Sequence, residues 1–348
     1  MASLIDMRSD TVTRPTPEMR QAMASAVVGD DVMNEDPTVI RLQEKTAELL
    51  GKEAAIFVPS GTMANQIAVG LHTHPGDELI CDPSAHVYVW EGGGVARLWG
   101  VTTRTVEPAQ SLLTLHDLQG KVRIDDPHYV RTRLVSLENT HNRAGGRIHP
   151  ITSIAEISGW ARAHNLAMHL DGARLMNAVV ASGISASEWA RYFDTVSICF
   201  SKGLGAPIGS ALTGSADLIA EAHRLRKVLG GGMRQVGVIA AAALHALEHH
   251  VDRLAEDHEN ARILAKVIEE SPGLALESPT VETNLIWIRV DPALGTAREV
   301  ADRLRSEGVL VIALGPQMLR ACTHLDLTRD DIARAADSFR RVSGAIAS

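Results

Sequence analysis

The chain has 348 residues, of which 45% are hydrophobic and 22% are charged, the composition of an ordinary globular protein. This length suffices for one large domain and a smaller one. The net charge of −8, with no basic cluster, argues against nucleic acid as a partner. No apolar stretch approaches the roughly 20 residues of a membrane span, and the charged N-terminal sequence lacks the apolar core of a signal peptide, so we expect no membrane partner.

The three cysteines, Cys81, Cys199 and Cys322, are far apart and include no Cys-x-x-Cys pair. An odd number of isolated cysteines is typical of free thiols in a reducing compartment. We therefore expect a cytoplasmic protein.

Short β-rich segments alternate with helical patterns through most of the chain. One such helix is predicted over 152–165, where apolar residues recur on one face. Strands that alternate with helices indicate a mostly parallel sheet with helices on both faces. The seven predicted strands are residues 54–58, 78–82, 101–107, 133–139, 166–171, 195–201 and 210–214.

From residue 217 the pattern becomes long-helical, with a glycine-rich break at 230–232, and a second α/β pattern follows. This second pattern predicts a small C-terminal domain with strands at 283–290, 309–314 and 318–327, a helix at 297–308 and a terminal helix. The predicted organisation is an N-terminal segment (1–22), a large domain (23–250) and a small domain (251–348).

The first predicted strand runs into "PSGTMANQ", where Ser60 has the character of a helix N-cap. Gly61 and Thr62 would then present free backbone N–H groups at a helix start, which suits a phosphate. An ordinary capped helix without a ligand explains the same residues.

The fifth predicted strand ends in "HLDGAR", which places the carboxylate of Asp171 at the edge of the sheet. A buried carboxylate needs a partner. Arg174 is one candidate for that partner, and a protonated ring nitrogen of a cofactor is the other.

The sixth predicted strand ends in "CFSK", so Lys202 follows it closely, with Ser201 beside it. A lysine in a partly desolvated pocket becomes nucleophilic and forms an imine with a carbonyl. An exposed lysine at the end of a strand is the simpler alternative.

These three features together predict a pyridoxal phosphate site. In an open parallel sheet, ligands bind beyond the carboxyl ends of the strands, which is where all of them lie. Pyridoxal phosphate requires a phosphate anchor, a carboxylate for its ring nitrogen and a lysine that binds its aldehyde.

Three further residues fit the same edge of the sheet. His86 and His141 each follow a predicted strand, and either could be a general base. Arg320, from the small domain, could clamp an α-carboxylate. Each of these side chains could equally be structural or exposed, with an inter-domain ion pair as a further alternative for the arginine.

We expect no metal ion. His245 and His249 are four residues apart on a predicted helix, but they lack the glutamate of an H-E-x-x-H motif and a third ligand. A solvated helix face explains them. The segment "GLGAPIG" does not match G-x-G-x-x-G, which excludes an ordinary dinucleotide site.

Several stretches resemble the low-specificity threonine aldolases of the threonine aldolase/β-eliminating lyase family, with the bacterial L-allo-threonine aldolases most similar. The resemblance extends from about residue 5 to 327, and "HLDGARL" together with "SKGLGAPIGS" is its most specific part. The other stretches are "DMRSDTVTRPTPEMRQAM", "FVPSGTMANQ", "LENTHN" and "GGGMRQVG".

The resemblance implies an α/β enzyme of pyridoxal phosphate fold type I, with a large domain, a small C-terminal domain and an N-terminal segment packed against them. It also implies a homotetramer with active sites at a dimer interface. The implied site residues are Lys202 for the cofactor aldehyde, Asp171 for its ring nitrogen, His86 stacked on the ring, Ser60, Gly61 and Thr62 for the phosphate, Ser9, Arg174 and Arg320 for the substrate carboxylate, and Arg234 for a neighbouring subunit's site.

The implied reaction is retro-aldol cleavage of L-threonine or L-allo-threonine, a small-molecule amino acid, to glycine and an aldehyde. His86 or His141 would take the hydroxyl proton, and His128 is a weaker candidate near the substrate. Two rivals remain, namely another lyase on the same fold (a phenylserine aldolase or a β-eliminating lyase) and a non-catalytic protein that keeps the fold.

The chain departs from the family pattern in places that bear on substrate preference. Met33 and Asn34 replace a more usual Tyr-Gly, and Trp90 and Trp99 are bulkier than the residues usual at those positions. The loop after His141 is also longer than in some relatives.

Overall fold

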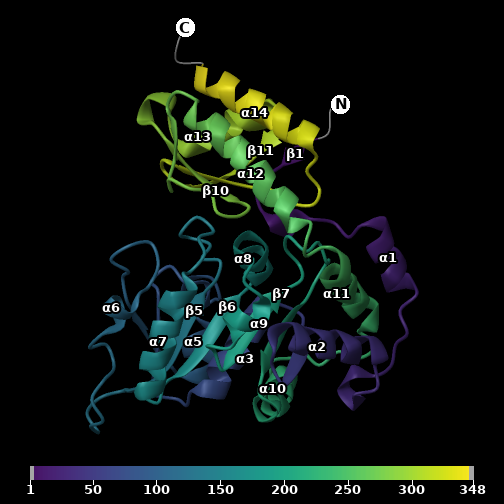
Figure 1. Ribbon diagram of the computed structural model, residues 1–348, viewed down its shortest axis with the longest axis vertical. Helices are drawn as coiled ribbons and strands as arrows, with labels where there is room; N and C mark the ends of the chain where they lie inside the picture. The colour runs from purple at the N-terminus through teal and green to yellow at the C-terminus, as the bar shows by residue number, and fades with distance from the viewer. Residues whose placement is uncertain (1–3, 345–348) are drawn as a thin grey trace.

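The computed structural model describes residues 4–344. Residues 1–3 and 345–348, the outer ends of the predicted N-terminal segment and small domain, lie outside this range. A large sheet covered by helices forms the lower part of the molecule in Figure 1, and a smaller sheet with three helices forms the upper part. No helix in the described part of the chain is both long and apolar enough to cross a membrane.

The large sheet has the seven strands that the sequence predicts, in the order β2-β8-β7-β6-β5-β3-β4. Strand β8 runs antiparallel to both of its neighbours, β2 and β7, and the other pairs of neighbouring strands in this sheet are parallel. The strands are β2 (Ala54–Val58), β3 (Asp77–Cys81), β4 (Thr102–Thr105), β5 (Arg131–Glu138), β6 (Ala167–Gly172), β7 (Thr195–Cys199) and β8 (Ser210–Gly214).

Alternation along β2 shows how this sheet is covered on both faces. Ile56 and Val58 pack in a cluster with apolar residues of α3 (Gly61–His72), whereas Phe57 belongs to the cluster that contains α2 (Pro37–Leu50). Successive side chains of a strand point to opposite faces, so both faces are buried. Fully covered parallel strands are typical of α/β folds.

The remaining elements around the large sheet include the long helices that the sequence predicts at 152–165 and beyond residue 217. They are α1 (Pro17–Ala24), α4 (His86–Val89), α5 (Gly94–Trp99), α6 (Leu115–Leu118), α7 (Ile151–Ala163), α8 (Leu175–Ser182), α9 (Ala186–Ala190), α10 (Ala216–Val228) and α11 (Gly237–His249), with short 3-10 turns at η1 (Asp10–Val12) and η2 (Asp31–Met33).

The smaller sheet is antiparallel, with strand order β12-β13-β10-β9. Its helices pack on it to form a second apolar core, separate from the core of the large sheet. The elements are α12 (Leu254–Glu269), β9 (Leu274–Leu276), β10 (Leu285–Val290), η3 (Pro292–Leu294), α13 (Ala297–Ser306), β12 (Ile312–Gly315), β13 (Met318–Cys322) and α14 (Arg329–Gly344).

The N-terminal segment joins both parts of the molecule. Strand β1 (Ile5–Asp6) pairs in parallel with β11 (Val309–Leu310), and Met7 is buried in the second core. Farther along, the Thr13 hydroxyl donates to the backbone carbonyl of Lys202 at 2.9 Å. The first residues of the chain therefore reach the end of strand β7.

Two predicted strand boundaries were wrong. The segment 309–314 forms two strands, because β11 pairs with β1 whereas β12 pairs with β13. The strand predicted over 318–327 ends at Cys322, because residues 325 and 326 form a turn in which the N–H of Leu327 bonds to the carbonyl of His324.

Candidate active site

A cavity of about 360 Å³ lies at the carboxyl edge of the large sheet, where the smaller sheet and the N-terminal segment meet it. The size is that of a small-molecule site. The cavity brings together five of the residues predicted from the sequence. Its lining comprises Ser9, Thr11, His86, Trp90, Asn142, Arg143, Arg174, Lys202, Ile312, Leu314 and Arg320.

Lys202 lies three residues beyond the end of β7. Its backbone carbonyl accepts hydrogen bonds from Thr13 and from the N–H of Gly205, which closes a tight turn. Gly205 has φ +82°, a conformation that glycine adopts without strain. The amine of Lys202 has no hydrogen bond or ion pair with any described residue. The backbone is thus fixed while the amine remains available to a ligand.

Asp171 is buried at the end of β6. Its two carboxylate oxygens accept hydrogen bonds from the amide of Asn65 at 2.7 Å and from the backbone of Ala173 at 3.1 Å. Burial favours the neutral acid, but the positive charges of His86 and Lys202 outweigh it and lower the pKa of Asp171. Asp171 is therefore a carboxylate anion. It does not pair with Arg174, which was one of the two partners considered from the sequence.

A polar network that the sequence analysis missed lies behind Asp171. The amide nitrogen of Asn65, on α3, donates to Asp171 and to Glu91 at 2.7 Å each. Its amide oxygen accepts the Ser197 hydroxyl at 2.8 Å and lies 3.1 Å from Nε2 of His169. All of these side chains are buried, and each has partners, as buried polar groups require.

His86, at the start of α4, connects this network to the cavity. Its Nδ1 lies 2.8 Å from Glu91, and its backbone N–H donates to Glu138 at 2.9 Å. Burial disfavours the charged ring, but the Glu91 hydrogen bond and the charge of Asp171 outweigh it and raise the pKa of His86 above its ordinary value. One ring nitrogen of His86 and one carboxylate oxygen each of Glu91 and Asp171 lie within 4.8 Å of one another, a spacing that could suit a metal ion. The hydrogen bonds that Asn65 and His86 make to these carboxylates explain the same spacing.

The structure distinguishes the two histidines that the sequence left as alternatives. His141 is buried and does not line the cavity. Its Nδ1 accepts the N–H of Ala144 at 3.2 Å, and its Nε2 faces Asp82 at 3.6 Å. Burial opposes protonation, but Asp82 and Glu138 raise the pKa of His141. Both ring nitrogens of His141 are thus directed at other protein groups, so His86 is the better-placed base.

Arg174 has a partner that the sequence did not suggest. Its guanidinium binds both oxygens of Asp10 at 2.6 and 2.7 Å, and both residues are buried. Burial opposes both charges, yet the pair lowers the pKa of Asp10 far below its usual range and raises that of Arg174. Arg174 also lines the cavity, so it contributes a positive charge there from a fixed position.

Arg320, on β13, reaches the cavity from the smaller sheet. It donates to Asn142 and to the carbonyl of Arg8, each at 3.1 Å, but no described residue gives it a carboxylate partner. Its buried Nε has no hydrogen-bond partner either. Burial and the nearby Arg174 lower its pKa. Ser9 lines the same cavity, with its hydroxyl bonded to Thr11.

The residues predicted to anchor a phosphate, Ser60, Gly61 and Thr62, form the capped start of α3. The Ser60 hydroxyl caps α3 by accepting the N–H of Met63 at 3.2 Å. A Cβ on Gly61 would lie 2.8 Å from the sulfur of Cys199, so the helix start approaches the end of β7 more closely than another residue would allow. Its first N–H groups have no partner within the helix. Ser201 lies just beyond the same strand and is half-buried.

Two further predicted residues, His128 and Arg234, also do not line the cavity. His128 is exposed in the loop before β5, at the opposite edge of the sheet, and its ring bonds to Asp126. Arg234 is exposed and forms an ion pair with Asp30 at 2.8 Å. Of the two tryptophans, Trp90 lines the cavity, whereas Trp99 packs against Gly70 of α3.

Comparison with known proteins agrees with the resemblance that the motifs indicate. Residues 6–291 match the beta-eliminating lyase family. The low specificity L-threonine aldolase of Escherichia coli K12 is 44% identical over 97% of this chain and 98% of its own length. Low-specificity L-threonine aldolase 1 of Arabidopsis thaliana is 40% identical over 97% and 96%.

A solved structure supports the fold independently. The threonine aldolase of Leishmania major superposes with a TM-score of 0.84 over 97% of this chain and 99% of its own, at 21% identity. At that identity the likeness concerns the fold alone, which is the α/β class predicted from the sequence. The chain belongs to the beta-eliminating lyase family and, within it, to the group of low-specificity L-threonine aldolases.

Proposed function

We propose that this protein cleaves L-threonine, L-allo-threonine and related β-hydroxy-α-amino acids into glycine and an aldehyde, with pyridoxal phosphate as cofactor. The observation that carries this proposal is the unpaired amine of Lys202, which lies close to the buried anion of Asp171. Lys202 also shares its cavity with Arg320, a cation to which no described residue offers a carboxylate. Relatives named as L-threonine aldolases over nearly the whole chain support the same reaction.

The residues present fit the cofactor. The N–H groups at the start of α3, with Ser60 and Ser201, would hold its phosphate, and Asp171 would bind the protonated ring nitrogen. His86 would lie against the ring, and Lys202 would bind the aldehyde carbon. Bound pyridoxal phosphate supplies an acceptor for the electron pair that remains on Cα when the Cα–Cβ bond breaks.

The α-carboxylate of the substrate binds to Arg320, with Ser9 beside it. A guanidinium with no carboxylate partner and an unsatisfied N–H is suited to an anionic ligand, because the ligand satisfies donors that the protein leaves open. Arg174, held by Asp10, adds positive charge from a fixed position. This contact holds the substrate in one orientation, which makes the later bond cleavage effectively intramolecular.

His86 takes the proton of the β-hydroxyl group. It is the one of the two candidate histidines that lines the cavity, and Glu91 fixes its ring through Nδ1. The neutral ring is the form that accepts a proton. Since the pKa of His86 is raised, the rate rises with pH through a value above the ordinary value of about 6.5.

We propose a cytoplasmic homotetramer in which Arg234, exposed in this chain, acts at a partner's site. The two separate apolar cores are consistent with a border near residue 250, since α12 packs in the second core.

The visible spectrum of the purified protein with added pyridoxal phosphate tests the cofactor, and acetaldehyde release read by a coupled reductase tests the reaction. We expect an imine absorbance band and acetaldehyde from L-threonine and L-allo-threonine. Lys202→Ala should lose both. No band in the wild type would overturn the proposal. A band with 2-oxobutyrate and ammonia as the products of L-threonine would assign a β-eliminating lyase, and cleavage of phenylserine alone would assign a phenylserine aldolase.

A further inference from the structure

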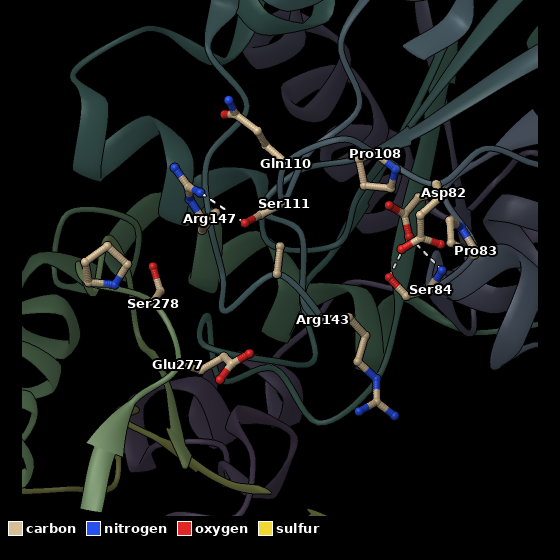
Figure 2. A pocket seen from close by; sticks show the side chains of 13 residues that line it. Asp82, Pro83, Ser84, Pro108, Gln110, Ser111, Arg143, Arg147, Glu277 and Ser278 are labelled. Carbon is tan, nitrogen blue, oxygen red and sulfur yellow. Dashed lines mark hydrogen bonds between the residues drawn. The ribbon is translucent and has the colours of Figure 1, made fainter.

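A second cavity of about 390 Å³ adjoins the candidate active site, between the edge of the large sheet and the smaller sheet (Figure 2). Arg143 lines both cavities. It follows His141 and Asn142 in the loop after β5, so the fold carries it from the carboxyl edge of the large sheet toward the smaller one. This arginine therefore marks the junction of the two cavities.

Two indole rings, one from each part of the molecule, hold the guanidinium of Arg143. The guanidinium carbon lies 4.7 Å from the centre of Trp90, beside α4, and 5.4 Å from that of Trp287, on β10. Aromatic stacking engages the faces of a guanidinium and leaves the N–H groups in its plane free. The stack thus orients Arg143 without using its hydrogen-bond donors.

Arg143 has no carboxylate partner and no hydrogen bond to another residue between 4 and 344. Most other charged groups of the two cavities do have partners. The pairs are Arg174 with Asp10, Asp82 with Ser84 and His141, Arg147 with Glu282, and Glu277 with Arg289. Glu107 is exposed at the rim of the second cavity.

The position of Arg143 relates it to the substrate. Trp287 is the cross-strand partner of Arg320, so the stack lies beside the residue that we assign to the α-carboxylate. Asn142, the neighbour of Arg143 in the chain, accepts the hydrogen bond of Arg320. Because Arg320 and Arg143 line the same cavity, a substrate held by Arg320 has a second guanidinium within that cavity.

We propose that Arg143 determines specificity by binding an acidic group on the β-carbon, so that 3-hydroxyaspartate and similar acidic β-hydroxy-α-amino acids are substrates. This inference rests on the proposed function. A preorganised guanidinium with free donors recognises a carboxylate through two parallel hydrogen bonds. We expect the acidic group to be short, because the second cavity beyond Arg143 is lined by Asp82, Glu107 and Glu277, whereas Arg147, which also lines it, is already paired with Glu282.

The chemistry is that of the proposed function with a different aldehyde. The Cα–Cβ bond of 3-hydroxyaspartate breaks, the hydroxyl oxygen loses its proton to His86 and becomes a carbonyl oxygen, and Cα takes up a proton. The products are glycine and glyoxylate, which together contain all atoms of the substrate. The carboxylate bound by Arg143 leaves as part of glyoxylate.

The first test compares kcat/KM for 3-hydroxyaspartate and L-threonine in the wild type, Arg143→Gln and Arg143→Lys. We expect the ratio of the two values to fall about 10- to 100-fold in Arg143→Gln, the loss of a charge-assisted contact, and to recover partly in Arg143→Lys. Arg147→Gln, which alters a paired cation of the second cavity, should leave the ratio unchanged. A ratio that Arg143→Gln does not change overturns the inference, as does a wild type that cleaves L-threonine but not 3-hydroxyaspartate.

A second measurement separates this inference from the proposed function. Binding of L-aspartate and L-asparagine to the protein loaded with pyridoxal phosphate, followed by the absorbance change, requires no cleavage. We expect L-aspartate to bind at least tenfold more tightly in the wild type and the two to bind equally in Arg143→Gln. Equal binding in the wild type overturns the inference. If the wild type binds L-aspartate more tightly than L-asparagine but cleaves neither L-threonine nor 3-hydroxyaspartate, the proposed function is overturned and this inference is not.

Discussion

Two parts of the candidate site differ in how their polar groups are bonded: the deep end, which comprises Asn65, Glu91 and Asp171, and the mouth, which comprises Arg143 and Arg320. At the deep end, Asn65, Glu91 and Asp171 are buried and bonded to one another, so their hydrogen bonds are made within the protein. At the mouth, Arg320 and Arg143 carry positive charges for which the described residues provide no carboxylate.

This contrast indicates where a ligand contributes to the site. A buried polar group without a partner costs free energy, so an open donor that faces a cavity, such as Nε of Arg320, favours a ligand that can satisfy it. The hydrogen bonds among the deep-end residues do not need a ligand, and they hold Asp171 in a fixed position. The mouth is completed by anions, and the carboxylates of an amino acid have the charge it requires.

Replacing the two histidines should separate a group at the site from one behind it. We expect His86→Asn to lower kcat by about 10²- to 10⁴-fold, the usual contribution of a general base. His141→Asn should lower it far less, because both ring nitrogens face other protein groups. Steady-state kinetics with L-threonine measures both. Equal losses in the two variants would assign the proton transfer elsewhere.

Asp10→Ala should show what happens when a completed pair is broken. The change leaves the charge of Arg174 buried without a partner, so we expect the free energy of unfolding to fall by about 3–5 kcal/mol. Urea denaturation gives this value. Glu188→Ala, which breaks the exposed pair with Arg191, is the matched control and should cost less than about 1 kcal/mol. Similar losses in both variants would contradict the distinction.

Arg320→Gln should have the reverse pattern, a loss of binding with little loss of stability. We expect KM for L-threonine to rise about 10- to 100-fold, since a charge-assisted contact to the carboxylate is lost. The free energy of unfolding should change little or rise, because a buried cation without a carboxylate partner is removed. A large loss of stability together with an unchanged KM would make Arg320 a structural residue.

Glu91→Gln should produce the smallest effect, visible through pH. Because the folded pKa of His86 is raised, its protonation stabilises the fold fully below the unfolded value of about 6.5, and this contribution is lost as pH rises through the folded pKa. We therefore expect the stability difference between wild type and Glu91→Gln to be larger, by about 1 kcal/mol or less, at pH 6 than at pH 9. Urea denaturation at both pH values measures it, and NMR titration should show a lower pKa for His86 in the variant. A difference that does not vary with pH would contradict the role of Glu91.

Much of the fold and part of the site could be predicted from the sequence. The alternation of strands and helices predicts seven strands, and the rule that parallel strands end at one edge brings Lys202 and Asp171 together. Strand β1, in contrast, has two residues, too few to show a period, and the strand predicted over 309–314 breaks because its two halves pair with different neighbours.

The partners of the site residues could not be predicted in this way. Asp10 lies far from Arg174 in the sequence, and only the fold of the N-terminal segment brings them together. The same holds for Glu91 beside His86 across the turn of α4, and for Arg143 between Trp90, which follows α4, and Trp287, on β10. Sequence patterns predict which edge a side chain reaches, whereas the pairing of charges depends on the tertiary structure.

The link from the N-terminal segment to β11 and to the carbonyl of Lys202 bears on how the protein is made. A ribosome releases the chain from its N-terminus, so β1 emerges long before the strand it pairs with. Ser9 and Asp10 cannot settle into the site until β11 has been synthesised, and Arg320 follows later still. A nascent or truncated chain would thus display Lys202 without the residues that complete its surroundings, and the assembled site would arise only as translation ends.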